Sequence, residues 1–187
     1  MSNSIEEITS VIGAERIGKH QATIDWILTD SRSLCFPEET LFFALKTKRN
    51  DGHKYIPELY ARGVRNFVVT DVPEQLSHYA DANFLQVGNT LKALQRLAAK
   101  HREQFQVSVV GITGSNGKTV VKEWIYQLLS PEKVITRSPR SYNSQIGVPL
   151  SVWMMNEHTE LVYLRLEFQK WVKWKHYSLS FSLLSEC

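Results

Sequence analysis

Short apolar runs alternate with segments of helical spacing along the first half of the chain. Strands are predicted at residues 24–28, 40–45, 66–70 and 84–87. A helix is expected to begin at Ser4, a polar cap followed shortly by two acids, and a second helix over residues 55–61 is expected to end at Gly63. These alternations of strand and helix indicate a small mixed α/β domain.

The middle of the chain combines a longer helical pattern with a strongly apolar run. Apolar residues at helical spacing over residues 91–105 predict a helix that connects or packs two domains. Residues 107–112 (VSVVGI) form an apolar run that is typical of a buried strand in a parallel sheet. A glycine-bearing loop and a helix over residues 118–129 are expected to follow, with residues 133–136 as a candidate for the next strand.

Composition places the chain among globular proteins. With 187 residues, 43% apolar and 22% charged, it is long enough for one ordinary domain or two small ones, and disorder is excluded as the default. No run of about 18 apolar residues predicts a membrane span, and the polar, acidic N-terminus predicts no secretory signal. Two cysteines indicate a cytoplasmic location, and Trp26 and Trp124 are expected to be core residues.

Charge and composition change abruptly at residue 161. Residues 1–160 hold 18 Lys and Arg against 17 Asp and Glu, whereas residues 161–187 hold 4 against 2. The last segment also lacks Gly, Pro, Ala, Asp, Asn, Thr, Ile and Met, although it carries six aromatic residues. Most of the net charge of +3 therefore belongs to the final segment, and the rest of the chain is nearly neutral.

The clearest chemical motif is G-I-T-G-S-N-G-K-T at residues 111–119, between the predicted buried strand and the next helix. This is the context of a phosphate-binding loop, in which backbone N–H groups and the helix N-terminus surround phosphate oxygens. Lys118 is expected to reach the terminal phosphates of ATP, and the Thr119 hydroxyl is expected to coordinate Mg²⁺. The other predicted ATP-binding residues are Gly114, Ser115, Asn116 and Gly117.

The spacing of this loop differs from the general G-x-x-x-x-G-K-[ST] pattern. That pattern needs Gly six residues before the Lys, where this chain has Ile112; here the glycines lie seven and four residues before it. The alternative interpretation is a glycine-rich turn with an exposed Lys.

The variant loop resembles the ATP loop of the Mur ligases, the enzymes that add amino acids to the peptidoglycan precursor. Other segments agree with this family and follow its order. They are T-D-S-R at residues 29–32, L-F-F-A-L at 41–45, D-G-H at 51–53, and Asn143 followed by I-G-V-P at 146–149. The resemblance covers about residues 20–160.

The resemblance implies an ATP-dependent ligase that forms an amide bond through an acyl phosphate. The agreement is closest to the members that join D-alanyl-D-alanine to UDP-N-acetylmuramoyl-tripeptide. It implies a mixed α/β N-terminal domain that binds the UDP-substrate at residues 1–88 and a connecting helix at 89–106. The start of a parallel-sheet ATP-binding domain is then expected at 107–160. Neither nucleic acid nor a membrane is an expected partner.

Four residues are expected to contact the UDP-substrate by this resemblance. Ser31 and Arg32 would otherwise be read as a solvated turn, and we expect them near the uridine diphosphate. His53 is either a ligand contact or part of an ordinary turn. Asn143 is either a helix cap or a substrate contact.

The resemblance is lost at Leu161, where the family has a strand ending in a metal-binding acid. Suitable codons for residues 162–187, read one base earlier, encode G-I-F-E-A-G-I-S-K-M-G, with Glu at the place of Arg165. We therefore expect residues 161–187 to be an out-of-frame tail and the chain to be a truncated ligase with little or no activity. The alternative is a genuine, divergent segment.

Two other functions remain open from the sequence. One is a non-catalytic module that binds nucleotide or UDP-sugar. The other is the sister ligase that adds the third residue of the peptide, because the residues that select the incoming group are expected beyond this segment.

Overall fold

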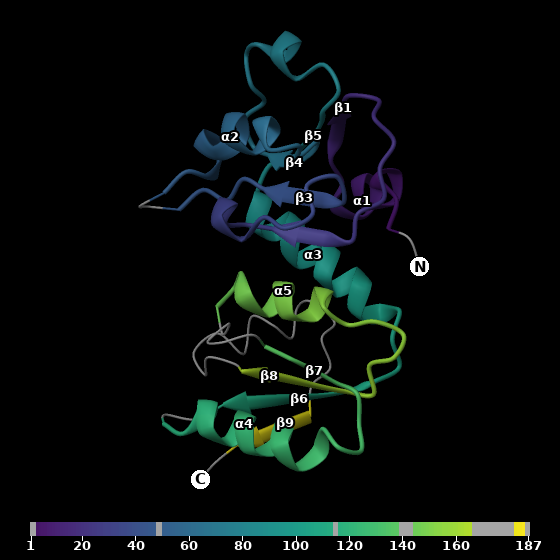
Figure 1. The fold of residues 1–187 in the computed structure, drawn as a ribbon, viewed down its shortest axis with the longest axis vertical. Helices are drawn as coiled ribbons and strands as arrows, with labels where there is room; N and C mark the ends of the chain where they lie inside the picture. The colour runs from purple at the N-terminus through teal and green to yellow at the C-terminus, as the bar shows by residue number, and fades with distance from the viewer. Residues whose placement is uncertain (1–2, 48–49, 114–115, 139–143, 166–181, 186–187) are drawn as a thin grey trace. The chain divides into compact units, whose positions relative to one another are not determined.

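A computed structural model of the chain describes residues 3–47, 50–113, 116–138, 144–165 and 182–185. The chain divides into two compact units, residues 1–97 and 98–187, which are coloured from purple to teal and from teal to yellow in Figure 1. The boundary lies inside helix α3 (Thr90–Glu103), which overlaps the predicted connecting helix.

The first unit is built on a five-stranded sheet. Its strands are β1 (Glu15–Ile17), β2 (Trp26–Leu28), β3 (Thr40–Phe43), β4 (Asn66–Val69) and β5 (Asn83–Gln86). In space their order is β1-β5-β4-β3-β2, where β2 to β5 are parallel and β1 runs antiparallel beside β5. The carboxyl ends of β2, β3 and β4 therefore meet at one edge of the sheet.

A side-chain cap and glycines mark the ends of helices in this unit. Helix α1 (Ile5–Ile12) begins at Ser4, whose Oγ accepts a hydrogen bond from the Glu7 N–H at 3.2 Å, as the sequence predicts. Helix α2 (Ile56–Ala61) is followed by Gly63, which has a φ of +98° that favours glycine. Three short 3₁₀ turns, η1 (Ser31–Ser33), η2 (Gly52–Tyr55) and η3 (Leu76–Tyr79), complete the unit.

The pairing register of β3, β4 and β5 places three phenylalanine rings of the core side by side. Phe42, Phe67 and Phe84 are direct neighbours across β3, β4 and β5, so their rings lie on one face of the sheet. The rings of Phe67 and Phe84 stack with centroids 5.4 Å apart, while Phe42 meets Phe67 edge to face at 6.4 Å. All three are at most 1% exposed, so this face is fully buried.

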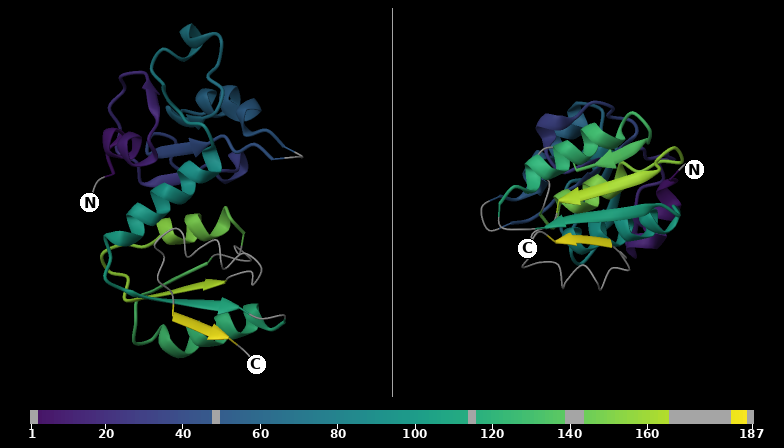
Figure 2. Two further views of the ribbon diagram at one scale, coloured as in Figure 1. Left: turned by 180° about the vertical axis from the view of Figure 1, so that it is seen from behind. Right: turned by 90° about the horizontal axis from the view of Figure 1, so that it is seen from below.

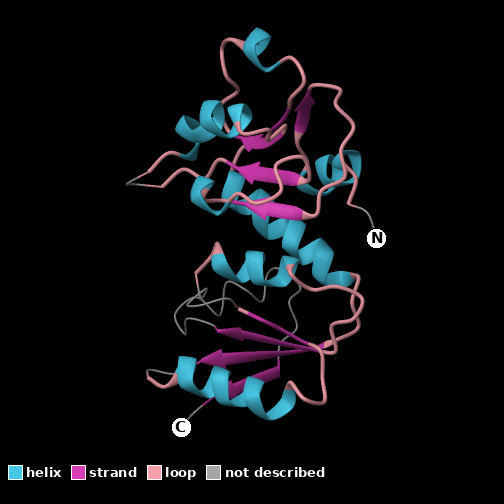
Figure 3. Ribbon diagram, viewed as in Figure 1, coloured by secondary structure: helices cyan, strands magenta, loops and turns pink. Residues whose placement is uncertain are grey.

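The second unit is built on a four-stranded parallel sheet. Its strands are β6 (Ser108–Thr113), β7 (Ile135–Arg137), β8 (Leu161–Arg165) and β9 (Ser182–Ser185), in the order β7-β8-β6-β9. Helices α4 (Lys118–Leu129) and α5 (Gly147–Trp153) cover opposite faces of this sheet (Figures 1 and 2). Figure 3 shows the four strands between the two helices.

The core of the second unit includes a buried histidine. Val148 and Val152 of α5 pack with Val162 and Leu164 of β8. Beside them, His101 of α3 has its Nε2 atom 3.0 Å from the Met155 carbonyl oxygen, to which the ring N–H donates. Burial lowers the pKa of His101, and the hydrogen bond to Met155 offsets this only in part, so the ring is neutral at pH 7.

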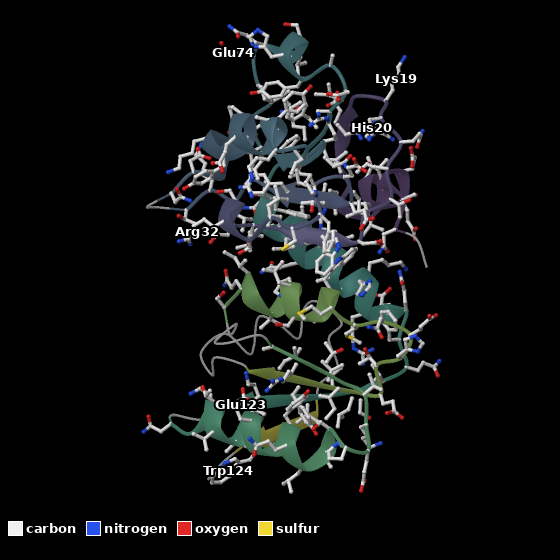
Figure 4. The ribbon with its side chains drawn as sticks, in the orientation of Figure 1. Lys19, His20, Arg32, Glu74, Glu123 and Trp124 are labelled. Carbon is white, nitrogen blue, oxygen red and sulfur yellow. The ribbon has the colours of Figure 1, made fainter. Side chains whose placement is uncertain are left out.

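The mixed α/β fold class is confirmed, and the predicted helix over Lys118–Leu129 has the predicted bounds. Strand β1 and helix α5 were not expected. The prediction that Trp26 and Trp124 are core residues is wrong, because they are 50% and 62% exposed. Trp26 lies on edge strand β2 and stacks on Phe36, while Trp124 points outward from α4 (Figure 4).

Most of the expected out-of-frame tail lies outside the described residues. Within it, the structure describes β8 (Leu161–Arg165) and the backbone of β9 (Ser182–Ser185). Strand β8 pairs in parallel with both β6 and β7, so residues 161–165 occupy an inner position of the sheet. Among the described residues, no helix has the length and apolar character needed to cross a bilayer.

The buried His101 predicts a pH-dependent stability. In the unfolded chain this ring takes up a proton near its ordinary pKa of 6.5, whereas the folded state resists protonation. The unfolded state therefore binds more protons as the pH falls below this value, and the free energy of unfolding decreases. Urea unfolding at about pH 7.5 and about pH 5.5 should show a smaller decrease in His101→Gln than in the wild type. An equal decrease in both proteins would contradict this role of His101.

Candidate functional site

The strongest candidate site lies where β6 leads into α4. Strand β6 ends at Thr113, and α4 begins at Lys118, directly after Gly117. Gly117 has a φ of +74°, a left-handed conformation that a residue with a Cβ adopts only with strain. The strand, loop and helix predicted for a phosphate-binding loop are therefore present in that order.

The first turn of α4 offers donors to an anion. N–H groups at a helix N-terminus lack intrahelical partners, although the Lys118 N–H donates to the Asn116 carbonyl at 2.9 Å, and the helix dipole adds partial positive charge there. Asn116, Gly117 and Thr119 are exposed, and Lys118 is half-buried at the start of the helix. An ammonium group and a hydroxyl group thus stand together at a surface position that suits phosphate.

One turn further along α4 stands a fully buried lysine. Lys122 is 1% exposed, and its Nζ donates to the carbonyl oxygen of Ser138 at 3.0 Å. The same Nζ lies 3.2 Å from Glu123 Oε1, and Glu123 also pairs with Arg137. Hydrogen bonds from Lys122 and then Arg137 hold the pKa of Glu123 below its usual range. Figure 4 shows Glu123 on α4.

Helix α5 begins with a cap from Ser144. The Oγ atom of Ser144 accepts from the N–H of Gly147 at 3.1 Å, and the Ser144 carbonyl accepts from Val148. Ser144 therefore satisfies backbone N–H groups at the start of α5. Asn143 itself lies outside the described residues, as do Gly114 and Ser115 of the phosphate loop.

The carboxyl end of β8 lies beside the phosphate loop. Its last residue, Arg165, is in register with Ile112 of β6, at the position where the family resemblance implies a metal-binding acid. Across the part of the chain that the structure describes, no cluster of three or more His, Cys, Asp or Glu could hold a metal ion. Thr119 and Asn116 are described residues at this loop with side-chain oxygens, the kind of ligand that Mg²⁺ prefers.

In the first unit, Ser31 and Arg32 follow β2 at the carboxyl edge. Asp30 caps this turn, and its carboxylate accepts from Arg32 Nη2 at 2.6 Å and from Arg32 Nε at 2.9 Å. These bonds lower the pKa of Asp30. The Arg32 side chain is 87% exposed and reaches the surface (Figure 4), whereas Ser31 is buried and its carbonyl accepts from Arg62.

His53 joins two neighbouring strand ends of the same sheet. Its Nδ1 lies 2.6 Å from Asp51 Oδ1, and its Nε2 accepts from the Thr70 N–H at 3.1 Å. Because a backbone N–H can only donate, Nε2 carries no proton and Nδ1–H donates to Asp51. The pKa of Asp51 is lowered, first by the His53 N–H and then by the His53 ring. Both ring nitrogens of His53 are therefore engaged within the protein.

A lysine at this edge lies between two carboxylates. Lys46 Nζ lies 3.7 Å from carboxylate oxygens of both Asp51 and Asp71. Together with Arg32, which pairs with Asp30, it places paired cationic and anionic side chains at the carboxyl edge of the parallel strands, where open α/β sheets bind ligands.

The structure places Ser31, Arg32 and His53 at one edge of the first sheet, after β2 and β3. Residues 116–119 lie at the carboxyl edge of the other sheet. The sequence predictions omit Lys122 and the contact between His53 and Thr70. The helical spacing of the sequence does contain a signal for Lys122. This residue lies four residues after Lys118 and three before Ile125, on the inward face of α4, and a charged side chain on an inward face is unusual.

Comparison with protein families gives two matches. Residues 23–102 match the model described as Mur ligase family, catalytic domain, and residues 112–169 match the Mur ligase middle domain. The second match extends past Leu161 and includes β8.

Two curated relatives share the name UDP-N-acetylmuramoyl-tripeptide–D-alanyl-D-alanine ligase. The protein of Bacillus subtilis is 35% identical over 148 residues, which cover 78% of this chain and 31% of the relative. That of Synechocystis is 41% identical over 126 residues, covering 67% of this chain and 27% of the relative. The chain thus spans about a third of the length of the relatives that it matches.

Solved structures agree with these matches. MurF from Acinetobacter baumannii superposes with a TM-score of 0.78 at 27% identity, covering 89% of this chain and 36% of that protein. MurF ligase from Thermotoga maritima in complex with ADP gives a TM-score of 0.63 at 28% identity, covering 75% and 31%.

The D-G-H segment has a steric requirement that can be tested. A Cβ added to Gly52 would lie 2.8 Å from the Leu45 nitrogen and 2.9 Å from two Ala44 backbone atoms, none of which can move independently. Gly52→Ala should therefore lower the free energy of unfolding by about 1–3 kcal/mol. Gly88→Ala is the matched control, because no heavy atom lies within 4 Å of its added Cβ. Similar urea midpoints for the two variants would disprove the requirement.

Proposed function

The chain belongs to the Mur ligase family, and from this premise we propose that it carries the UDP-substrate and ATP-phosphate sites of an ATP-dependent carbon–nitrogen ligase. The reaction proposed is the addition of D-alanyl-D-alanine to UDP-N-acetylmuramoyl-tripeptide, after the names of the relatives. The observation that carries the proposal is the passage from β6 through Gly117 into α4, with Lys118 and Thr119 in the first helical turn.

The proposed chemistry has two steps. The substrate carboxylate attacks the γ-phosphorus of ATP, which forms an acyl phosphate and releases ADP. The amine of D-alanyl-D-alanine then attacks the acyl carbon, and phosphate leaves as the nitrogen loses a proton. The first step brings two anions together, so the Lys118 ammonium and the N-terminus of α4 favour it by offsetting the repulsion.

Mg²⁺ is proposed as the companion of ATP. The Thr119 hydroxyl would hold it, and the ion would neutralise charge on the phosphates. The end of β8 carries Arg165 rather than an acid, so Thr119 is the protein ligand that we propose. The remaining ligands would come from nucleotide phosphates and water, which Mg²⁺ commonly retains.

The UDP-substrate is proposed to bind at the carboxyl edge of the first sheet. The exposed guanidinium of Arg32, whose Nε and Nη2 donate to Asp30, is proposed to contact the diphosphate, with the buried Ser31 next to it in the chain. His53 supports this edge by joining the segment after β3 to the end of β4. Asn143 remains a proposed substrate contact. We also propose a cytoplasmic location, where this substrate would be used. The sister ligase that adds the third peptide residue is an alternative to the proposed function.

Nucleotide binding by the 187-residue chain tests the proposal. Wild-type protein should bind ADP, and Lys118→Met should weaken this binding at least about tenfold, because a charged hydrogen bond to phosphate is lost. Isothermal titration calorimetry measures both affinities. Lys133→Met is the matched control, since Lys133 is exposed in the same unit and away from the loop. Equal ADP affinity of the wild type and Lys118→Met would rule out this phosphate site.

A second candidate, a binding module without catalysis, is favoured by Arg165 at the end of β8. The two candidates differ in turnover. With ATP, UDP-N-acetylmuramoyl-tripeptide and D-alanyl-D-alanine present, a coupled assay of phosphate release reports ligation. We expect the 187-residue chain to bind ADP and UDP without releasing phosphate above the Lys118→Met background. Release that exceeds this background and requires D-alanyl-D-alanine would show that this chain ligates and would exclude the module; nucleotide binding without such release would support the two binding sites and show no ligation by this chain.

A further inference from the structure

We propose that Lys122 is a positioning residue of the nucleotide site, an inference that rests on the proposed function. Its buried ammonium holds the carboxyl end of β7 against α4, the helix that begins at the phosphate loop. Through this contact, a nucleotide bound at the start of α4 stabilises the end of β7, two strands away from β6 in the sheet.

Burial of the ammonium is the first observation. The Lys122 side chain is 2% exposed, and a charge removed from water is costly unless it is paired and hydrogen-bonded. An apolar side chain of similar length would fill the same space without that cost. A lysine at this position is therefore poorly explained by packing alone, and its specific contacts indicate the reason for it.

The contacts of Ser138 are the second observation. Ser138 is 0% exposed and follows the last residue of β7. Its N–H donates to the carbonyl of Tyr163 in β8 at 3.1 Å, and its own carbonyl accepts from Lys122 Nζ at 3.0 Å. A buried carbonyl beyond the end of a strand has no ladder partner of its own, so the ammonium supplies the required donor.

The position of Lys122 on α4 is the third observation. Lys118 and Lys122 are four residues apart, so they lie on one face of the helix, one turn from each other. Glu123 balances the charge of Lys122 and is itself held by Arg137, the last residue of β7. Among the described residues, the Lys122 ammonium on the Ser138 carbonyl and the Glu123–Arg137 ion pair thus join the first two turns of α4 to the end of β7, and the Lys122 side chain is the more deeply buried.

Exchange of the Ser138 amide hydrogen tests this inference. In the wild-type chain, saturating ADP should slow this exchange by about tenfold, although Ser138 is not a proposed ligand contact. In Lys122→Met the ADP-dependent slowing should fall below about twofold, and the ADP affinity should decrease by about tenfold. Site-resolved NMR exchange and calorimetry measure the two effects at a temperature where both proteins are folded.

Glu123→Gln is the matched control. It removes the charge that balances Lys122, and so lowers stability, but it keeps an amide oxygen as an acceptor and does not alter the Lys122 and Ser138 groups, so the ADP-dependent slowing should persist. Where Lys122→Met does not fold, Lys122→Gln removes the charge and shortens the side chain, and the same loss is expected. A general loss of stability would speed exchange with and without ADP alike and would leave the ADP effect unchanged.

The outcomes separate the two proposals. If wild-type protein does not bind ADP, the proposed function is wrong, and the positioning role of Lys122 is wrong as well. If ADP binds but slows Ser138 exchange equally in the wild type and in the Lys122 variant, the proposed function stands and the positioning role of Lys122 is wrong.

Discussion

Parallel strand pairing is the constraint on which both units depend. When strands run parallel, their carboxyl ends meet at one edge, and the last backbone groups there lose the partners that the ladder supplies elsewhere. Each unit satisfies these groups with side chains from a neighbouring segment. In the first unit His53 accepts from the Thr70 N–H, and in the second Lys122 donates to the Ser138 carbonyl. The same edges carry the candidate ligand-binding residues.

The two edges use different chemistry for the same purpose. His53 is a neutral acceptor whose tautomer is set by Asp51, so the first edge gains a rigid contact without a buried net charge. Lys122 is a buried cation whose charge is balanced by Glu123 at the rim. The Thr70 N–H at the first edge needs a hydrogen-bond acceptor, whereas the Ser138 carbonyl at the second edge needs a donor. The neutral imidazole and the ammonium are therefore not interchangeable between the two edges.

Local patterns were sufficient to predict much of the fold, because they depend on neighbouring residues in the chain. The cap at Ser4 and the helix over Lys118–Leu129 are cases of this kind. Exposure was harder to predict. Trp26 and Trp124 were expected in the core, yet one lies on an edge strand and the other on the outer face of α4, and neither position is visible in the apolar pattern alone. The inward position of Lys122 can be seen in the helical spacing of α4, but its contact with Ser138, sixteen residues away, cannot.

The continuity of α3 across the boundary of the two units has a consequence for dissecting the protein. A cut between residues 97 and 98 would divide one 14-residue helix into two pieces of about two turns each. Helices of that length are marginal in water, because the cost of nucleation is spread over too few hydrogen bonds. Separately expressed halves would each carry a frayed end, so a dissection that keeps α3 whole in one fragment is the better choice.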